Sequence, residues 1–173
     1  MTALKASQIH NERLTDRHSN PDIDISRSDQ NIIFFKTENI SEDVKRRVAD
    51  IQSRQKRKIR SDAPVAIEYM ITASPEAMAR LSKQEQERYF AECLSFVEAR
   101  HGIGNRLNAV LHLDETTPHL HMLCLSRARW EVGRQKLLQT ACSNGLARRI
   151  CNQSREAIRI GTRRPVNRTA RKG

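Results

Sequence analysis

Short apolar runs alternate along the first 125 positions with longer segments of helical spacing. Four of the runs are rich in β-branched or other apolar residues and predict strands: 31–36 (NIIFFK), 64–73 (PVAIEYMITA), 105–114 (NRLNAVLHLD) and 119–126 (HLHMLCLS). A weaker run at 2–6 (TALKA) predicts a short first strand, followed over 7–15 by a short helix or loop. Because ETTP is a turn-like sequence, the last two strong runs predict a β-hairpin.

Two longer segments have the features of amphipathic helices. The first covers 40–60, with Ser41 as the expected N-cap and an inward face formed by Val44, Val48, Ile51 and Ile59. The second begins with SKQE at 82–85, which has capping-box spacing, and runs to about Arg100 before Gly102. Its expected inward residues are Tyr89, Phe90, Cys93, Leu94 and Val97.

The order of these elements predicts an α+β fold. Strands dominate both ends of the segment, and two helices separate them, which favours helices packed on a mostly antiparallel sheet. A further helix near 134–159 is expected, although its apolar pattern is poor. His101, at the end of the second helix, is expected to be structural, because an imidazolium there suits the helix dipole.

Charge divides the chain into two parts. Residues 1–125 hold 18 Lys+Arg and 18 Asp+Glu, whereas residues 126–173 hold 13 against 2, which accounts for the net charge of +11. We therefore expect a balanced domain over 1–125 and a basic extension over 126–173, with its last part disordered. The extension is either a solvated charged tail or a non-specific attraction for DNA. The excess positive charge points to a polyanionic partner, most often nucleic acid.

No run of eighteen apolar residues occurs, and the first residues lack the apolar core of a signal peptide. We therefore expect a cytoplasmic protein. None of the cysteines forms a C-x-x-C pair, so all are expected to be reduced and structural: Cys93, Cys124, Cys142 and Cys151.

The sequence HLDETTPHLH at 112–121 concentrates possible metal ligands in one hairpin. His119 and His121 lie on the same face of a strand, about 7 Å apart by strand rise. His112 can face them from the preceding strand, and Glu115 can reach the same point from the turn. Three imidazoles and a carboxylate that converge in this way predict a metal site rather than structural histidines.

Three segments in order resemble motifs of the MobV-type plasmid mobilisation relaxases, also called Pre/Mob plasmid recombination enzymes. HLDETTPHLH matches every fixed position of the third motif, H-x-D-E-x-x-P-H-x-H. HNER at 10–13 is similar to the first motif, H-N-x-R, and HSNPDIDISRSDQN at 18–31 is similar to the segment that follows it. After the third motif the chain departs from the family pattern, so the resemblance covers the balanced domain and not the basic extension.

The resemblance implies a fold similar to HUH-type relaxases, with metal-binding histidines on the middle strands of an antiparallel sheet. It also implies an enzyme that nicks one strand at a plasmid transfer origin and stays covalently attached to the 5′ phosphate. A divalent ion, Mn²⁺ or else Mg²⁺, would support activity. Origin DNA would be the partner, with a conjugative coupling protein as a second candidate. The resemblance implies these residues: metal ligands His112, Glu115, His119 and His121; catalytic His10 and Arg13; DNA-binding Asn11, Arg13, Arg27 and Asn31; supporting Asp22, Asp24 and Asp114.

The identity of the nucleophile is open to argument from the residues. Most relaxases use tyrosine, but Tyr69 is expected on a strand and Tyr89 on a helix, and neither lies in a motif. A neutral imidazole is nucleophilic, so His10 is the favoured nucleophile, with a role as general base as the alternative. At the level of the whole protein, a catalytically inactive or truncated remnant that binds DNA is the alternative to an active enzyme. A metal-dependent hydrolase of small molecules is disfavoured by the charge.

Overall fold

The computed structural model describes residues 2–56, 58–60 and 63–126. Its helices and strands occur in the following order: α1 Thr2–Asn11, 3-10 helix η1 Ile25–Gln30, β1 Ile32–Lys36, α2 Ile40–Arg54, β2 Ala66–Thr72, α3 Pro75–Ala79, α4 Lys83–His101, 3-10 helix η2 Ile103–Asn105, β3 Arg106–His112 and β4 His119–Leu125. The four strong apolar runs and both long helices of the sequence prediction are present.

The four strands form one antiparallel sheet in the order β1-β3-β4-β2. β3 and β4 are the central hairpin, and every residue of β4 is buried. A strand that is covered on both faces is mostly apolar, and the buried polar residues of these two strands, Asn108, His112, His119 and His121, all have hydrogen-bond partners. The predicted α+β class with an antiparallel sheet is confirmed.

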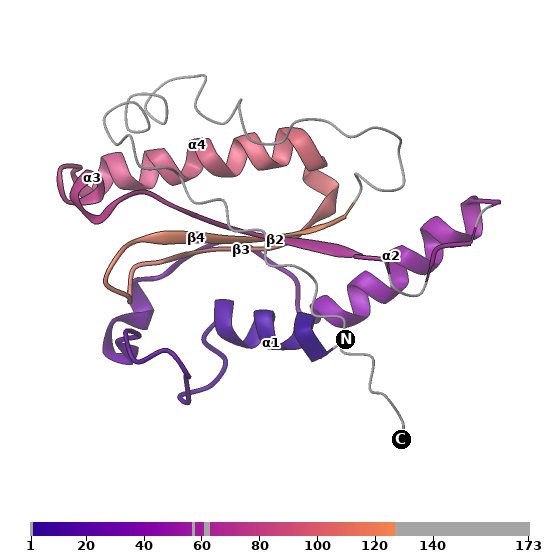
Figure 1. Cartoon of the computed structure of the whole chain (residues 1–173), viewed down its shortest axis with the longest axis horizontal. Coiled ribbons are helices and arrows are strands. Elements are labelled where there is room, and N and C mark those ends of the chain that lie inside the picture. The colour runs from indigo at the N-terminus through magenta and orange to yellow at the C-terminus, as the bar shows by residue number, and fades with distance from the viewer. Residues whose placement is uncertain (1, 57, 61–62, 127–173) are drawn as a thin grey trace.

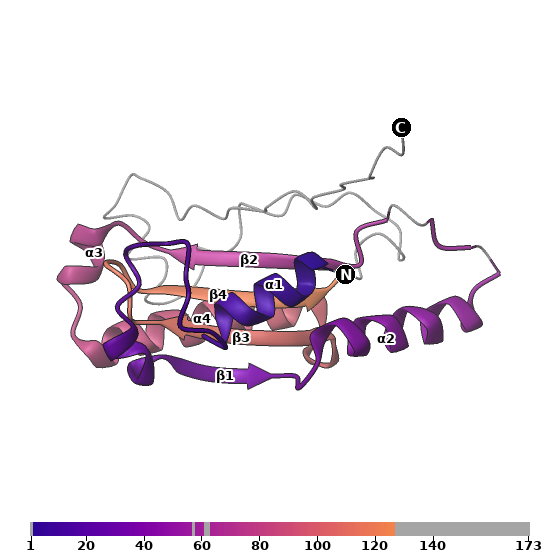
Figure 2. The same ribbon diagram turned by 90° about the horizontal axis from the view of Figure 1, so that it is seen from below.

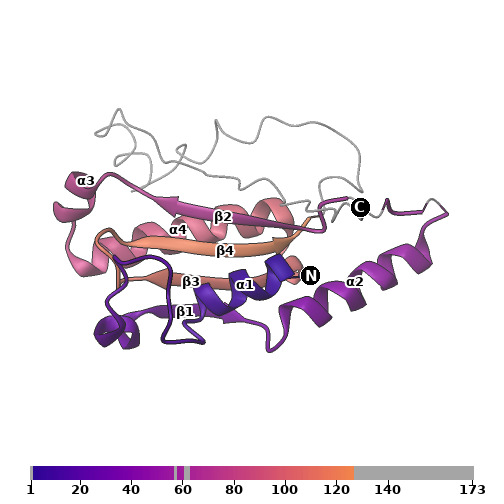
Figure 3. The same ribbon diagram turned by 60° about the horizontal axis from the view of Figure 1, so that its bottom comes forward.

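Helices cover both faces of this sheet (Figure 1). α4 lies along one face, where Leu120, Met122 and Cys124 of β4 pack into the main core cluster. The intervening residues of β4 point to the other face, where Leu123 and Leu125 pack with α2 residues in a second cluster. Seen from below, α1 crosses this second face and α2 extends away from one end of the sheet (Figures 2 and 3). The first half of β4 therefore faces α1.

The prediction for α4 is confirmed in detail. Ser82 and Glu85 form a capping box, and all five predicted inward residues are buried. Gly102 ends the helix at φ 84°, a conformation that a residue with a Cβ rarely adopts.

Residues 2–6 are helical, so the predicted first strand is wrong. The helix places Ser7 and Asn11, one turn apart, against the same carboxylate, that of Glu68 on β2. Buried Gln8 lies on the same helix and donates to the carbonyl oxygens of Thr37 and Glu38. These contacts to the sheet outweigh the weak strand pattern.

The predicted boundaries of α2 are also wrong. Its N-cap is Asn39, whose side chain accepts from the Glu42 backbone N–H, so Ser41 already lies inside the helix. The helix ends at Arg54 because Gln55 is extended, several residues before the expected end near residue 60. Short helix α3 was not predicted, although Ser74 caps it and Pro75 occupies its first turn.

Several expectations lie outside the described residues: the helix near 134–159, Cys142, Cys151 and the basic extension beyond residue 126. Within the described part, Cys93 and Cys124 are free and buried, as predicted, and burial raises the pKa of each thiol to about 12. No helix in that part is both long and apolar enough to cross a membrane.

Candidate active site

Four histidines from three elements meet on the sheet face beneath α1. His10 comes from the last turn of α1, His112 ends β3, and His119 and His121 begin β4. The ring centres of His112, His119 and His121 lie 4.8–5.0 Å apart in every pair. His10 lies 5.6 Å from His112 and 5.3 Å from His121. The hairpin predicted from HLDETTPHLH thus gathers its histidines on one face, and α1 adds a fourth.

Hydrogen bonds fix which nitrogen of each hairpin histidine is unprotonated. A carbonyl oxygen can only accept, so His112 Nε2 donates to Asn11 O (2.9 Å) and His119 Nδ1 donates to Thr117 O (2.9 Å). His121 Nδ1 donates to the Glu68 carboxylate (3.2 Å). The opposite nitrogen of each ring keeps its lone pair, as it does in histidines that bind metals. Two of these, His112 Nδ1 and His119 Nε2, face each other at 3.3 Å, and the guanidinium of Arg13 lies beside them, with its Nη2 donating to His112 Nδ1 (3.1 Å).

Glu68 is a member of the site that the sequence analysis missed. Its carboxylate accepts from His121, from Asn11 Nδ2 (3.0 Å) and from Ser7 Oγ (3.1 Å). Burial alone would raise the pKa of Glu68, but these hydrogen bonds hold it at about 2, so the group is a carboxylate at neutral pH. A single acidic residue within the apolar strand VAIEYMIT was the available indication, because a charge at such a position needs a partner.

Glu115 lies in the β3–β4 turn, where two side chains hold it. Its Oε1 accepts from Arg13 Nη2 (2.7 Å), and its Oε2 accepts from Asn20 Nδ2 (2.8 Å). Oε1 also lies 3.7 Å from His112 Nδ1 and 3.6 Å from His119 Nε2. Burial would raise the pKa of Glu115, yet the hydrogen bonds and nearby charges hold it at about 2. A charged carboxylate therefore adjoins the lone pairs of two histidines.

Arg13 joins the first and third motifs. Its guanidinium forms a bidentate ion pair with Asp114, with both N–O distances at 2.8 Å. Ser28 Oγ donates to the same carboxylate (2.7 Å), and these contacts lower the pKa of Asp114 against the opposing effect of burial. Arg13 itself has φ 52°, a conformation that is uncommon outside glycine and is held here by the ion pair.

The possible ligand atoms fall into two groups that share His112. One ring nitrogen each from His10, His112 and His121 lies within 4.8 Å of the others, and the same holds for the ligand atoms of His112, Glu115 and His119. The sequence analysis placed His112, Glu115, His119 and His121 in one ligand set. The structure instead groups the ligand atoms of His112 with those of Glu115 and His119, and places His121 in the other group, to which it adds His10.

The ionisation of His10 suits a nucleophile or a ligand. Burial, reinforced by the nearby His121 and Arg13, lowers the pKa of His10 to about 4, so the imidazole is neutral near pH 7. Burial also lowers the pKa of His119 to about 4. The pKa of His121 is lowered by burial and by the nearby His112. His10 and His119 are therefore neutral imidazoles near pH 7, the form in which histidine binds metals.

Both tyrosines lie in the core cluster on the α4 side of the sheet. Tyr69 OH is hydrogen-bonded to His101 Nε2 (2.7 Å), and Tyr89 is fully buried. Burial raises the pKa of both phenols. Burial also lowers the pKa of His101, so the expected imidazolium at this helix end is wrong. A buried imidazole that accepts a hydrogen bond from a phenol is better neutral than charged.

The remaining predicted residues surround the site. Asn11 is buried and donates to Glu68, and Asn31 Oδ1 accepts from the Leu113 backbone N–H (2.7 Å). Exposed Arg27 donates to Leu113 O (2.7 Å). Asp24 caps η1 and its N–H donates to Asp114 O (2.8 Å), while Asp22 is exposed. Asn11 and Asn31 thus direct their side chains into the protein.

Solved structures place this fold in a known class. The chain is similar to the relaxase domain of MobM (MOBV; Mob_Pre), solved with Mn and bound to plasmid oriT DNA. The two are 27% identical, with a TM-score of 0.66 over 79% of this chain and 70% of that one. A second structure of that domain gives a TM-score of 0.68 over 96% of this chain at 22% identity, which supports the fold alone.

The sequence identifies the family more closely. The model of the plasmid recombination enzyme family, Mob_Pre, matches residues 1–146, so the chain belongs to this family. A plasmid recombination enzyme of Bacillus thuringiensis is 42% identical over 121 residues, which are 69% of this chain and 26% of that protein. One of Lactiplantibacillus plantarum is 35% identical over 129 residues, or 70% and 36% of the two chains. The chain therefore spans about a quarter to a third of these relatives.

Proposed function

We propose that this protein is a relaxase that nicks one strand at a plasmid origin of transfer and later rejoins it. The observation that supports this most directly is the position of His10, which lies against His112 and His121 of the hairpin on one sheet face. The net charge of +11 and the oriT DNA bound by MobM are consistent with a DNA substrate. We place the activity in the cytoplasm, where plasmid DNA is found.

The residues fit a divalent ion. Each of three histidines has one N–H fixed by an acceptor and one lone pair that faces the cluster, and a carboxylate adjoins them. We propose His112, Glu115, His119 and His121 as ligands of Mn²⁺, with Mg²⁺ as the other candidate ion. When bound, such an ion supplies positive charge next to a non-bridging oxygen of the scissile phosphate.

His10 is the proposed nucleophile. A nitrogen of its neutral ring attacks phosphorus, the bond from phosphorus to the 3′ oxygen breaks, and that oxygen leaves with a proton as a 3′ hydroxyl. The imidazole loses its own proton, and the product is a phosphoramidate between His10 and the 5′ phosphate. Attack by the 3′ hydroxyl reverses the step and rejoins the strand. Arg13 Nη1, 3.5 Å from His10 Nδ1, is positioned to stabilise the charge on the phosphate.

The other side chains have supporting roles in this proposal. Asp114 and Asp24 hold Arg13 and the β3–β4 turn, and the backbone N–H of Asp22 donates to Asn20, the residue that holds Glu115. Arg27 is placed to contact the DNA backbone at the surface of the site. The family motifs imply that Asn11 and Asn31 bind DNA. In this proposal they hold the end of β3 instead: Asn11 O accepts from His112 Nε2, and Asn31 Oδ1 accepts from the backbone N–H of Leu113.

The test is incubation of the full chain with Mn²⁺ and supercoiled plasmid that contains the origin adjacent to its gene. We expect relaxed plasmid and a covalent protein–DNA adduct with the parent, and neither with His10→Ala. Brief acid treatment should cleave the adduct, because a phosphoramidate is acid-labile and a phosphotyrosine is not. An acid-stable adduct would move the nucleophile to a tyrosine. Absence of any adduct would favour a DNA-binding remnant over an enzyme.

A further inference from the structure

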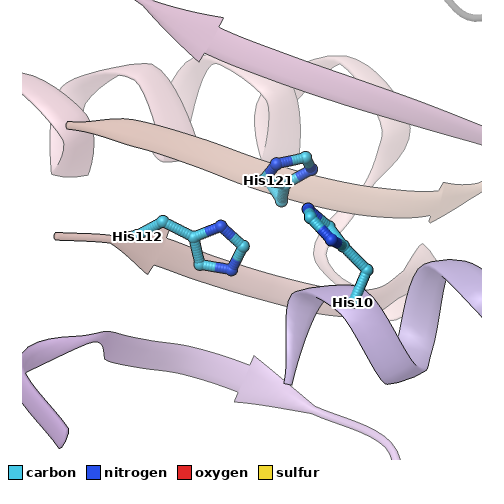
Figure 4. Close-up of side chains that lie close together, drawn as sticks. All are labelled: His10, His112 and His121. Atoms are coloured by element: carbon cyan, nitrogen blue, oxygen red, sulfur yellow. The ribbon is translucent and has the colours of Figure 1, made fainter. Parts of the chain in front are cut away.

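His10 lies against two of the proposed metal ligands. One ring nitrogen from each of His10, His112 and His121 is within 4.8 Å of the other two, and the three rings face a common space (Figure 4). An ion about 2.1 Å from each nitrogen would hold the ring centres roughly 5 Å apart. The ring centres of this trio are 4.8, 5.3 and 5.6 Å apart, so small side-chain rotations would complete the coordination.

Glu115 has other partners on the opposite side of the cluster. Arg13 and Asn20 each donate to one of its oxygens, at 2.7 and 2.8 Å. On the His121 side, the nearby carboxylate is that of Glu68, which is already bonded to His121 Nδ1, to Asn11 and to Ser7. The side chain that shares a group of possible ligand atoms with His112 and His121 is the imidazole of His10, whose Nδ1 also lies 3.5 Å from Arg13 Nη1. Neutral imidazole is the commonest metal ligand in proteins.

We propose that His10 is itself a ligand of the divalent ion in the DNA-free protein, together with His112 and His121. This inference rests on the proposed function, because it concerns the same ion and the same nucleophile. Coordination occupies the nitrogen lone pair that would attack phosphorus. An incoming phosphate oxygen can take the place of His10 on the ion, which frees the imidazole only where a phosphate is present. The resting protein thereby holds its nucleophile unreactive.

The test is a titration of the full chain with Mn²⁺ in the absence of DNA, with free Mn²⁺ followed by electron paramagnetic resonance. His10→Ala should weaken Mn²⁺ binding at least ten-fold, as His121→Ala should. His18→Ala is the matched control, because His18 belongs to neither group of possible ligands, and it should bind Mn²⁺ like the parent. Equal affinity of His10→Ala and the parent would overturn the inference.

A second measurement uses the parent protein and does not depend on the folding of a variant. Diethylpyrocarbonate modifies neutral imidazoles through the same lone pair that binds a metal, so Mn²⁺ should protect His10 when the modified peptides are quantified by mass spectrometry. Modification of His18 should not change. Equal modification of His10 with and without Mn²⁺ would also overturn the inference.

The plasmid assay separates failure of this inference from failure of the proposed function. If the parent forms an adduct while His10→Ala binds Mn²⁺ as the parent does, only the resting coordination is wrong. If Mn²⁺ protects His10 but the parent forms no adduct, the coordination stands and the relaxase proposal falls.

Discussion

Arg13 and Asp114 form a bidentate ion pair across 101 positions of sequence, with both N–O distances at 2.8 Å. The side chains are 8% and 0% exposed, so the pair is almost completely removed from water. It ties the loop after α1 to the β3–β4 turn, and Arg13 has a left-handed backbone conformation where it forms the pair. The position of His10, three residues before Arg13, therefore depends on this pair.

Asp114→Asn should lower the free energy of unfolding by up to about 3 kcal/mol, because the buried guanidinium loses its bidentate partner and keeps the single ion pair with Glu115. Urea denaturation measures the change. Glu42→Gln is the control, since the Glu42–Lys45 pair on α2 is exposed and its loss should cost less than about 0.5 kcal/mol. Similar losses in the two variants would show that the buried pair does not stabilise the fold.

Glu68→Ala should weaken Mn²⁺ binding about 10–100-fold, although Glu68 is not a proposed ligand. The variant removes the acceptor that holds His121 Nδ1, so the ring can rotate and its lone pair loses its fixed direction. Glu68→Gln keeps an oxygen acceptor at the same place and should lose less affinity than Glu68→Ala. Mn²⁺ titration checks both variants, and an alanine variant with the affinity of the parent would remove Glu68 from the site.

The strands and the capped helix α4 were predictable because their evidence is local. Ser82 and Glu85 are three residues apart, and most residues of β3 and β4 are apolar. The sequence predicts a strand at residues 2–6, where the structure has a helix. The contacts that favour the helix join α1 to residues far away in the sequence, on the sheet and in the loop after β1. Local propensity is a weak guide where such tertiary contacts decide.

The candidate site divides in the same way. His112, Glu115, His119 and His121 are close in sequence, so strand alternation was enough to bring them together. The place of Glu68 could not be found by spacing, since it depends on β2 pairing with β4 so that Met70 lies opposite His121. Strand order is a property of the whole sheet, and a single sequence does not reveal it.

Removal of residues 160–173 should weaken DNA binding equally for all sequences and flatten its dependence on salt. This segment contains five Lys+Arg, and each phosphate contact contributes about 0.7 to the slope of log K against log salt for single strands. Fluorescence anisotropy at several salt concentrations measures the slope. A variant with all five changed to Gln should behave as the deletion does, and an unchanged slope would identify a solvated tail.

His101 should make the fold less stable as the pH falls below 6.5. Burial lowers the pKa of His101 in the folded protein, with a smaller contribution from Arg100, and Tyr69 OH is hydrogen-bonded to its Nε2. The unfolded chain, with a pKa near the ordinary value of 6.5, then binds a proton that the folded protein does not. The free energy of unfolding consequently falls with pH by at most about 1.4 kcal/mol per pH unit from this group.

His101→Gln keeps an acceptor for Tyr69 but cannot bind the proton, so its unfolding free energy should depend less steeply on pH below 6.5. Urea denaturation in EDTA between pH 7.5 and 5 gives the slope of the unfolding free energy against pH for the parent and for the variant. This range spans the ordinary pKa of histidine, about 6.5. The site histidines with lowered pKa contribute equally to parent and variant, so the difference between the slopes isolates His101. Identical slopes would mean that His101 is protonated in the folded protein, as the helix dipole alone would favour.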